Sequence, residues 1–199
     1  MSKQFDPQDK YFNRAKQEGY RARSAFKLEE IQERYKIIKP GDKVLDLGAA
    51  PGSFLQYIFK VVGEKGIAVG IDLQEIESFP DKNILTFKGD IYDEKLYKKI
   101  VQQIGMEEFD VITSDLAPKT SGVKFVDGGR SLDLSLQVLE IAKNYLKKDG
   151  GCVMKILPGF NEGELLSVVN KMFKTVKKFR PKAVRKSSGE SYVICLDKL

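Results

Sequence analysis

At 199 residues, with a hydrophobic fraction of 42% and a formal net charge of +6, the chain suits one domain with at most a small extension. No apolar run approaches the roughly 18 residues of a membrane helix, and the N-terminus lacks the apolar stretch of a signal peptide. We therefore expect a cytoplasmic protein without a membrane partner. The chain has no histidine and two cysteines, both in apolar segments, which argues against a metal site and favours buried thiols.

Positive charge gathers at the two ends of the chain. Residues 1–40 hold ten Lys/Arg against six Asp/Glu, and residues 171–186 hold eight Lys/Arg and no acid. Such clustering indicates either a surface for a polyanion such as RNA or a solvated lysine-rich surface. We expect a basic arm over residues 1–23, attached to a core over residues 24–199, and one RNA-binding surface made by the arm and the C-terminal run. The basic residues of the arm that we assign to it are Arg14, Lys16, Arg21 and Arg23.

Aromatic residues lie between the basic residues of the arm. Their rings would stack on bases while the cations meet phosphates, or they would pin the arm to the core. In the second case the arginines also serve only to tie the arm down.

Apolar periodicity predicts a helix that begins at the N-cap Ser24 and ends before the turn at 39–42. Further helices are expected over residues 54–62, 96–104, 132–146 and 162–173. Strands are expected over residues 44–47, 67–71, 84–87, 109–113, 152–157, 175–182 and 191–196. The polar, glycine-rich residues 119–130 are expected to form a loop that covers a substrate. Strands alternate with helices until two final strands, which predicts an α/β fold. Its sheet has seven strands, mainly parallel with one antiparallel strand, and helices on both faces.

Residues 44–54, Val-Leu-Asp-Leu-Gly-Ala-Ala-Pro-Gly-Ser-Phe, form a strand, a glycine turn and the start of a helix. In an α/β chain this unit makes an adenosine-cofactor pocket at the carboxyl end of the sheet. The Gly48–Gly52 spacing matches neither the dinucleotide fingerprint nor a P-loop, and Pro51 has no N–H for a pyrophosphate. A ligand without phosphates fits better, and S-adenosylmethionine is the obvious one. The alternative is a plain structural turn.

Acidic residues fall at or beside four predicted strand ends, where ligands of open α/β sheets bind. These residues are Asp46, Asp72, Asp90 and Asp115. Asp72, at the end of the second strand, stands where ribose hydroxyls are held. Asp90 would accept a hydrogen bond from the exocyclic amine of adenine, or else cap a helix.

Lys155 interrupts the apolar strand 152–157. A lysine is rarely buried without a partner, so Lys155 is either a proton acceptor or a strand-edge residue that reaches water. Glu190 directly precedes the last strand, which in such sheets commonly lies beside the fifth. We therefore expect Glu190 to lie next to Lys155 and orient it.

A set of motifs spreads over nearly the whole chain: Tyr20–Leu28, Asp46–Phe54, Gly70–Asp72, Gly89–Asp90, Ser114–Pro118, Val153–Lys155 and Ser188–Tyr192. With these motifs the chain resembles the FtsJ family, RrmJ-like ribosomal RNA methyltransferases that transfer a methyl group from S-adenosylmethionine to a ribose 2′-hydroxyl. The resemblance implies a Rossmann-like methyltransferase fold and a catalytic tetrad of Lys27, Asp115, Lys155 and Glu190. It implies cofactor contacts at Gly52, Phe54, Asp72, Asp90 and Asp115. Phe54 follows Ser53 where many bacterial members have Gly-Trp, so the indole N–H is missing here.

The implied reaction is an in-line displacement, for which positioning supplies much of the rate. Lys155 would accept the hydroxyl proton, Lys27 would stabilise the developing oxyanion, and Asp115 with Glu190 would orient the two lysines. Alternatively, Lys155 stays charged and only steers the hydroxyl.

The expected substrate is RNA, first a uridine of large-subunit ribosomal RNA, and the expected enzyme is a monomer. Transfer RNA and messenger cap substrates remain alternatives, as does a non-catalytic RNA-binding module with a relic cofactor pocket. Methylation of amines is disfavoured, because the turn at Asp115–Pro118 lacks the Pro-Pro-aromatic sequence typical of that reaction.

Overall fold

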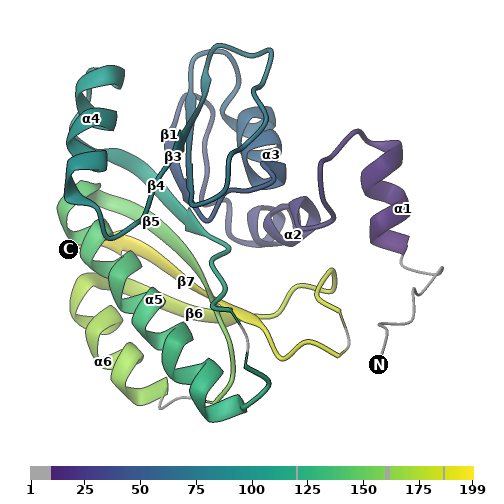
Figure 1. Ribbon diagram of the computed structural model, residues 1–199. Helices are drawn as coiled ribbons and strands as arrows, with labels where there is room; N and C mark the ends of the chain where they lie inside the picture. The colour runs from purple at the N-terminus through teal and green to yellow at the C-terminus, as the bar shows by residue number, and fades with distance from the viewer. Residues whose placement is uncertain (1–9, 120, 160–161, 186) are drawn as a thin grey trace.

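The computed structural model describes residues 10–119, 121–159, 162–185 and 187–199. Within these residues seven strands form one sheet in the order β3-β2-β1-β4-β5-β7-β6 (Figure 1). The strands are β1 (Lys43–Leu47), β2 (Ile67–Asp72), β3 (Ile84–Lys88), β4 (Phe109–Ser114), β5 (Leu146–Ile156), β6 (Phe173–Phe179) and β7 (Ser191–Lys198). Strand β7 runs antiparallel to both of its neighbours, and the other pairs are parallel. The predicted sheet is therefore confirmed, including its single antiparallel strand.

Helices cover both faces of this sheet, as predicted. They are α1 (Lys10–Gln17), α2 (Ala25–Tyr35), α3 (Ser53–Val62), α4 (Glu94–Ile104), α5 (Lys124–Tyr145) and α6 (Glu162–Met172). Successive side chains of a strand point to opposite faces. Leu45 and Leu47 therefore pack into one buried cluster with α4, α5 and α6, whereas Val44 packs into a second cluster with α2 and α3.

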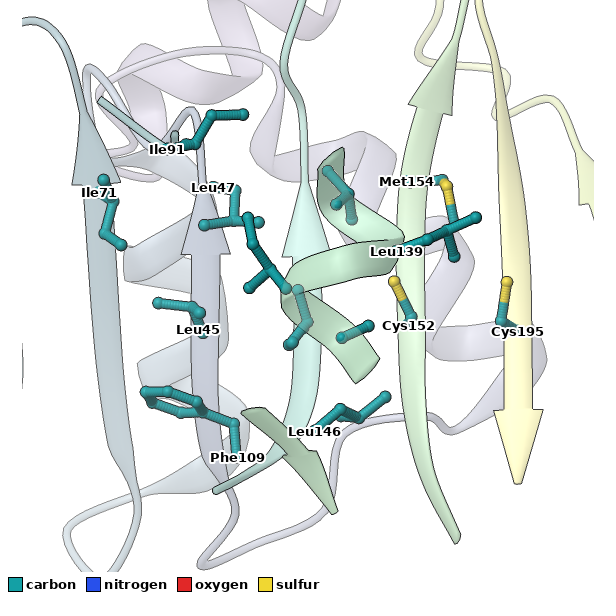
Figure 2. Close-up of a cluster of buried hydrophobic side chains, with 14 of the residues drawn as sticks. Leu45, Leu47, Ile71, Ile91, Phe109, Leu139, Leu146, Cys152, Met154 and Cys195 are labelled. Carbon is teal, nitrogen blue, oxygen red and sulfur yellow. The ribbon is translucent and has the colours of Figure 1, made fainter. Parts of the chain in front are cut away.

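The first of these clusters holds the two sulfur atoms of the cysteines. Figure 2 shows Leu139 of α5 in front of β5, with Cys152 on β5 and Cys195 on β7. Both cysteines are fully buried and free, and burial raises the pKa of the Cys152 thiol to about 12. The prediction of buried thiols is confirmed, and burial with a raised pKa makes them unreactive.

Several element boundaries differ from the sequence-based expectation. Ser24 stands at the N-cap of α2, but its hydroxyl makes no capping bond and instead lies 2.7 Å from the Ser53 hydroxyl. Helix α2 ends at Tyr35, before the predicted turn is reached, and the C-cap Lys36 adopts the left-handed conformation. Strand β6 begins and ends earlier than predicted, at Phe173 and Phe179.

The largest difference is the start of α5 at Lys124, because residues 119–130 were expected to be a loop. The carboxylate of Asp127 accepts hydrogen bonds from the backbone N–H groups of Ser121 and Gly122, and these bonds fold the segment before the helix back onto its first turn. At the other end, Leu146 was assigned to the helix face but begins β5. Residue 120 lies outside the described residues.

The arm contains the helix α1, which polarity alone did not predict. The rings of Tyr11 and Tyr20 lie 5.8 Å and 5.5 Å from the ring of Phe26 on α2, and the Arg14 guanidinium lies 4.2 Å above that ring. These aromatic residues therefore pin the arm to α2. Among the described residues we find no helix with the length and apolar character needed to cross a membrane.

Candidate active site

The carboxyl ends of the parallel strands bring the predicted acids to one edge of the sheet. Leu47 of β1 is in register with Ile71 of β2 and with Ser114 of β4. Asp46 precedes Leu47, Asp72 follows Ile71, and the backbone N–H of Asp115 donates to the Leu47 carbonyl at 3.3 Å. Asp90 comes two residues after the end of β3, at the same edge. The structure thus assembles all four acids where ligands of such sheets bind.

The four residues of the predicted tetrad lie together beside this edge. Asp115 is the centre: its Oδ1 lies 3.1 Å from Lys155 Nζ, and its Oδ2 lies 3.8 Å from Lys27 Nζ. Lys155 also donates a hydrogen bond to the backbone carbonyl of Asp115. Glu190 Oε1 lies 2.6 Å from Lys27 Nζ. Lysines and acids therefore alternate in the order Lys155, Asp115, Lys27 and Glu190.

This order corrects one expectation, because Glu190 was predicted to orient Lys155. In the antiparallel pairing of β5 with β7, Lys155 is in register with Tyr192. Glu190 precedes the first residue of β7 and so lies beyond the end of β5, where Lys27 of α2 reaches it. The partner of Lys155 is Asp115 instead.

Tyr192 is the residue of this site that sequence reasoning missed. Its side chain is fully buried, and its hydroxyl donates to Asp115 Oδ1 at 2.5 Å. Burial, followed by the charge of Asp115, raises the pKa of Tyr192 well above its usual range, so the hydroxyl remains a donor. A tyrosine in an apolar strand was a usable signal, since a buried hydroxyl requires a hydrogen-bond partner.

The ionisation of Asp115 follows from these contacts. Burial favours the neutral acid, but the charges of Lys155 and Lys27 and the hydrogen bond from Tyr192 outweigh it and lower the pKa of Asp115 below its usual value. Asp115 is therefore a carboxylate at neutral pH, and its two oxygens lie near the Nζ atoms of Lys155 and Lys27.

The glycine turn after β1 is closely enclosed. Gly48 and Gly52 have positive φ angles of 77° and 106°, in the region that favours glycine. A Cβ at Gly52 would lie 2.6 Å from Phe79 Cζ, and one at Gly48 would lie 2.7 Å from Leu116 Cδ2. Asp72 orders the same turn, because its Oδ2 accepts from the Ala50 N–H at 2.9 Å.

The predicted cofactor residues differ in how they are exposed at this edge. Asp72 is half-buried and also accepts from Gln74 N–H, whereas Asp90 is exposed and accepts from Tyr92 N–H. The N-cap of α4 is Asp93, so the alternative in which Asp90 caps that helix is wrong. Phe54 is only 3% exposed and packs in the core between α3 and the sheet, where its ring offers almost no surface to a ligand.

A buried carboxyl group at this edge has one oxygen without a hydrogen-bond partner among the described residues. Asp46 Oδ1 accepts from the Thr113 hydroxyl at 2.7 Å, while its Oδ2 is buried and has no partner among the described residues. Burial raises the pKa of Asp46 well above its usual range, and the charges of Asp115 and Asp72 raise it further. S-adenosylmethionine carries an ammonium and a sulfonium and no phosphate, which suits an acidic, unsatisfied edge next to a glycine turn.

Comparison with known proteins assigns the family. A model of FtsJ-like methyltransferases matches residues 20–198. This chain belongs to the FtsJ-like methyltransferase family. It is similar to the ribosomal RNA large subunit methyltransferase E of Syntrophobacter fumaroxidans, with 44% identity over 186 residues that cover 94% of this chain and 93% of the relative. The protein of the same name from Bdellovibrio bacteriovorus is 41% identical over 194 residues, covering 98% of both chains.

Solved structures agree with this family. A protein described as a ribosomal RNA methyltransferase of Plasmodium falciparum has a TM-score of 0.80 and 27% identity, and the match covers 90% of this chain and 99% of that chain. Fibrillarin from Aeropyrum pernix, solved with S-adenosyl-L-methionine, has a TM-score of 0.57 at 15% identity, covers 87% of this chain and 73% of that chain, and shows the shared fold. The FtsJ-like chain is thus a methyltransferase with a Rossmann-like fold, and S-adenosylmethionine is its cofactor.

In the FtsJ-like chain, the arm arginine that lies nearest the glycine turn is bound by the protein itself. The Arg21 guanidinium donates to the carbonyls of Pro51 at 3.0 Å, Glu77 at 2.7 Å and Ser78 at 2.9 Å, and it lies 3.7 Å above the Phe79 ring. The guanidinium is therefore already bound by three carbonyls and stacked on a ring. This geometry supports the alternative in which Arg21 ties the arm to the core.

The arm and part of the basic C-terminal run lie side by side. Arg23 donates to the Ala183 carbonyl, and Glu30 of α2 accepts from the backbone N–H groups of Lys182 and Ala183 at 2.6 Å and 2.8 Å. The lysines of β6 lie apart from this contact, and two of them form ion pairs, Lys174 with Asp149 and Lys178 with Glu162. The adjoining part of the basic run is therefore residues 180–185; residue 186 lies outside the described residues.

A groove of about 590 Å³ lies between the arm, α3 and the segment before β3. Tyr20, Phe59, Phe79 and Lys60 are among its lining residues, and none of the tetrad residues lines it. The groove therefore lies outside the predicted site. Within the described ranges, no group of three or more His, Cys, Asp or Glu residues is arranged to hold a metal ion.

Proposed function

We propose that this chain transfers the methyl group of S-adenosylmethionine to a ribose 2′-hydroxyl of large-subunit ribosomal RNA, with a uridine as the first expected target. The observation that carries the proposal is the alternating cluster of Lys155, Asp115, Lys27 and Glu190 beside the acidic edge of the sheet. We infer large-subunit RNA as the substrate from the names of two relatives, which are 41% and 44% identical to this chain.

In this proposal the acidic edge holds the cofactor. Asp72 accepts from the ribose hydroxyls, Asp90 accepts from the adenine amine, and Gly52 lets the ligand approach the backbone. The bound S-adenosylmethionine supplies an electrophilic methyl group on a sulfonium. The Asp115 carboxylate already contacts two lysines and a tyrosine. It therefore interacts with the cofactor mainly through its negative charge.

In this proposal the tetrad accepts the proton of the attacking hydroxyl and stabilises the charges that develop. A neutral Lys155 accepts the proton of the attacking 2′-hydroxyl at Nζ, and the carboxylate of Asp115, 3.1 Å away, stabilises the ammonium that results. Lys27, which Glu190 Oε1 contacts at 2.6 Å, stabilises the developing oxyanion. The alternative role, in which Lys155 stays charged and orients the hydroxyl, uses the same contacts.

The test compares Lys155→Ala with Lys148→Ala, which removes an exposed lysine from the same strand. Lys155→Ala should bind S-adenosylmethionine in calorimetry as the wild type does, while single-turnover methylation of unmodified large-subunit RNA falls by about 10²–10⁴-fold. Lys148→Ala should match the wild type in both measurements. Methylation by Lys155→Ala within a few-fold of the wild type would refute the assignment of Lys155.

Mapping the methylated nucleotide decides the substrate. A ribose-methylated uridine in large-subunit RNA supports the proposal, and methylation of transfer RNA or of a messenger cap replaces it. A protein that binds RNA but transfers no methyl group to any RNA would be the binding module with a relic pocket. A cytoplasmic location, a monomeric enzyme, and the division into an arm (1–23) and a catalytic core (24–199) accompany this proposal as predictions.

A further inference from the structure

Three apolar side chains are exposed together at the start of α5. Phe125 is 81% exposed, Val123 is 56% exposed and Val126 is 39% exposed. Phe125 is the most exposed of the large apolar side chains in the described residues. A large apolar group held in water next to a binding site indicates a contact surface.

The segment that carries Phe125 is held in place by its own hydrogen bonds. The Asp127 carboxylate accepts from Ser121 N–H at 2.7 Å, from the Ser121 hydroxyl at 2.8 Å and from Gly122 N–H at 3.1 Å. Arg130 Nη1 donates to the Lys119 carbonyl at 3.0 Å. Phe125 is thus presented on an ordered helical turn, which limits the entropy lost when a partner binds it.

Close contacts of two segments link this turn to the tetrad. Gly159, after β5, lies so close to α5 that a Cβ there would be 2.2 Å from the Lys124 carbonyl oxygen. Pro158 packs on Gly189, where a Cβ would lie 2.6 Å from Pro158 Cγ, and Gly189 directly precedes Glu190. The turn with Phe125, the segment after β5 and the segment before β7 therefore form one wall beside the tetrad.

A second link joins the helix to the strand of Lys155. The Ser131 hydroxyl, six residues and thus about 1.7 turns beyond Phe125 along α5, accepts from Leu157 N–H at 3.0 Å. Leu157 is two residues after Lys155. The position of Phe125 relative to Lys155 is therefore set by direct contacts between α5 and the end of β5.

The charge beside Phe125 favours RNA over an apolar protein surface. Lys124 precedes Phe125, and Lys119 lies at the start of the same segment; both side chains are exposed. A base needs a flat apolar face and its phosphates need cations, and an aromatic ring among lysines supplies both. Lys155 is only 9% exposed, and a ribose that has turned out of a base stack approaches such an amine more freely than one held in the stack.

We propose that Phe125 stacks on the base next to the target nucleotide and so holds the target out of the stack, with its ribose at Lys155. This inference rests on the proposed function. Phe125 is a positioning residue, because it touches the RNA beside the reacting atoms and takes no part in the proton transfer.

The test uses two RNAs that carry the mapped target nucleotide, one in a base-paired hairpin and one in a single strand. Phe125→Ala should lower kcat/KM on the hairpin by about 10-fold or more, because stacking on an aromatic ring is lost. The loss should be much smaller on the single strand, where little stacking must be broken. Calorimetric affinity for S-adenosylmethionine and the melting temperature should equal those of the wild type.

Three further variants distinguish stacking by an aromatic ring from contact by any large apolar side chain. Phe125→Tyr keeps the ring and should restore the hairpin activity, whereas Phe125→Leu keeps an apolar side chain without a ring and should behave as Phe125→Ala. Leu166→Ala removes an exposed apolar side chain from α6 and is the matched control, without effect on either RNA.

Three results would overturn the inference while the wild type methylates RNA. The first is equal activity of Phe125→Ala and the wild type on the hairpin. The second is full hairpin activity of Phe125→Leu. The third is an activity loss of Phe125→Ala seen only with assembled ribosomal particles, which would make Phe125 a protein contact. If the wild type methylates neither RNA nor particles, the proposed function itself fails, and this inference fails with it.

Discussion

Two adjacent glycines in α5 provide a controlled test of how closely the helix packs beside the site. A Cβ at Gly128 would lie 2.4 Å from the carbonyl carbon of Gly159, 2.7 Å from its oxygen and 2.8 Å from its Cα. A Cβ at Gly129 would meet no described atom within 4 Å. Replacing each glycine by alanine therefore makes the same chemical change in two different surroundings.

The expected magnitude follows from this contrast. Alanine stabilises a helix interior by about 0.5–1 kcal/mol relative to glycine, and this gain is common to both variants. Gly128→Ala must in addition separate two backbones by more than about 1 Å to reach an ordinary carbon–carbon contact of roughly 3.5–4.0 Å. Overpacking of this kind costs about 1–3 kcal/mol, and because the helix gain cancels, this is the expected difference in free energy of unfolding between the two variants.

Urea denaturation followed by circular dichroism measures this difference directly. For a chain of this size it corresponds to a melting temperature roughly 2–12 °C lower for Gly128→Ala than for Gly129→Ala. Gly128→Ala should also methylate RNA more slowly, because the wall beside the tetrad shifts, whereas Gly129→Ala should keep wild-type activity. If Gly128→Ala is as stable as Gly129→Ala, the packing of α5 against the segment after β5 is not as described, and the rigid presentation of Phe125 loses its basis.

Three further predictions concern single side chains. Asp72→Ala should weaken S-adenosylmethionine binding by about 1.5–3 kcal/mol, because a charge-assisted acceptor is lost, and an unchanged dissociation constant in a folded variant would remove Asp72 from the pocket. Arg21→Ala should lower the melting temperature and leave the salt dependence of RNA affinity unchanged, since its guanidinium binds three carbonyls; a shallower salt dependence at constant stability would instead make Arg21 a phosphate contact. Burial raises the pKa of Asp46, so the folded state keeps its proton while the unfolded state loses it above about pH 4, and the contribution of Asp46 to wild-type stability falls as the pH rises through that window. Asp46→Asn removes this titration, so the stability of the variant relative to the wild type should rise from pH 4 to pH 7 in denaturation curves; a difference independent of pH would contradict the raised pKa.

The order and type of most elements could be predicted from the sequence, because they depend on local pattern. The mostly apolar strand at Val44–Leu47, the helix expected over residues 54–62 and the final two consecutive strands each depend on a few neighbouring residues. The same holds for the acidic edge of the sheet. In a parallel sheet the strand ends share one edge, so Asp72 and Asp115 meet there whatever the details of packing.

The start of α5 could not be predicted from local pattern, since glycine and polar residues normally indicate a loop. A glycine stands at position 128 inside the helix because Gly159 approaches too closely for a side chain there. The helix begins where the Asp127 carboxylate binds the preceding backbone N–H groups. Both reasons are contacts that exist only in the folded chain, so the spacing of apolar residues along the sequence does not reveal them.

The composition of the tetrad was implied by the sequence, but the pairing within it was decided by tertiary structure. Whether Glu190 meets Lys155 or Lys27 depends on the register of β7 against β5, and that register places Tyr192 opposite Lys155. Lys27 reaches the site from α2, more than 160 residues before Glu190 in the chain. Side-chain types limit which ion pairs are possible, whereas the distance between two charges is set by the packing of helices and strands far apart in sequence, so only the folded chain determines which pairs form.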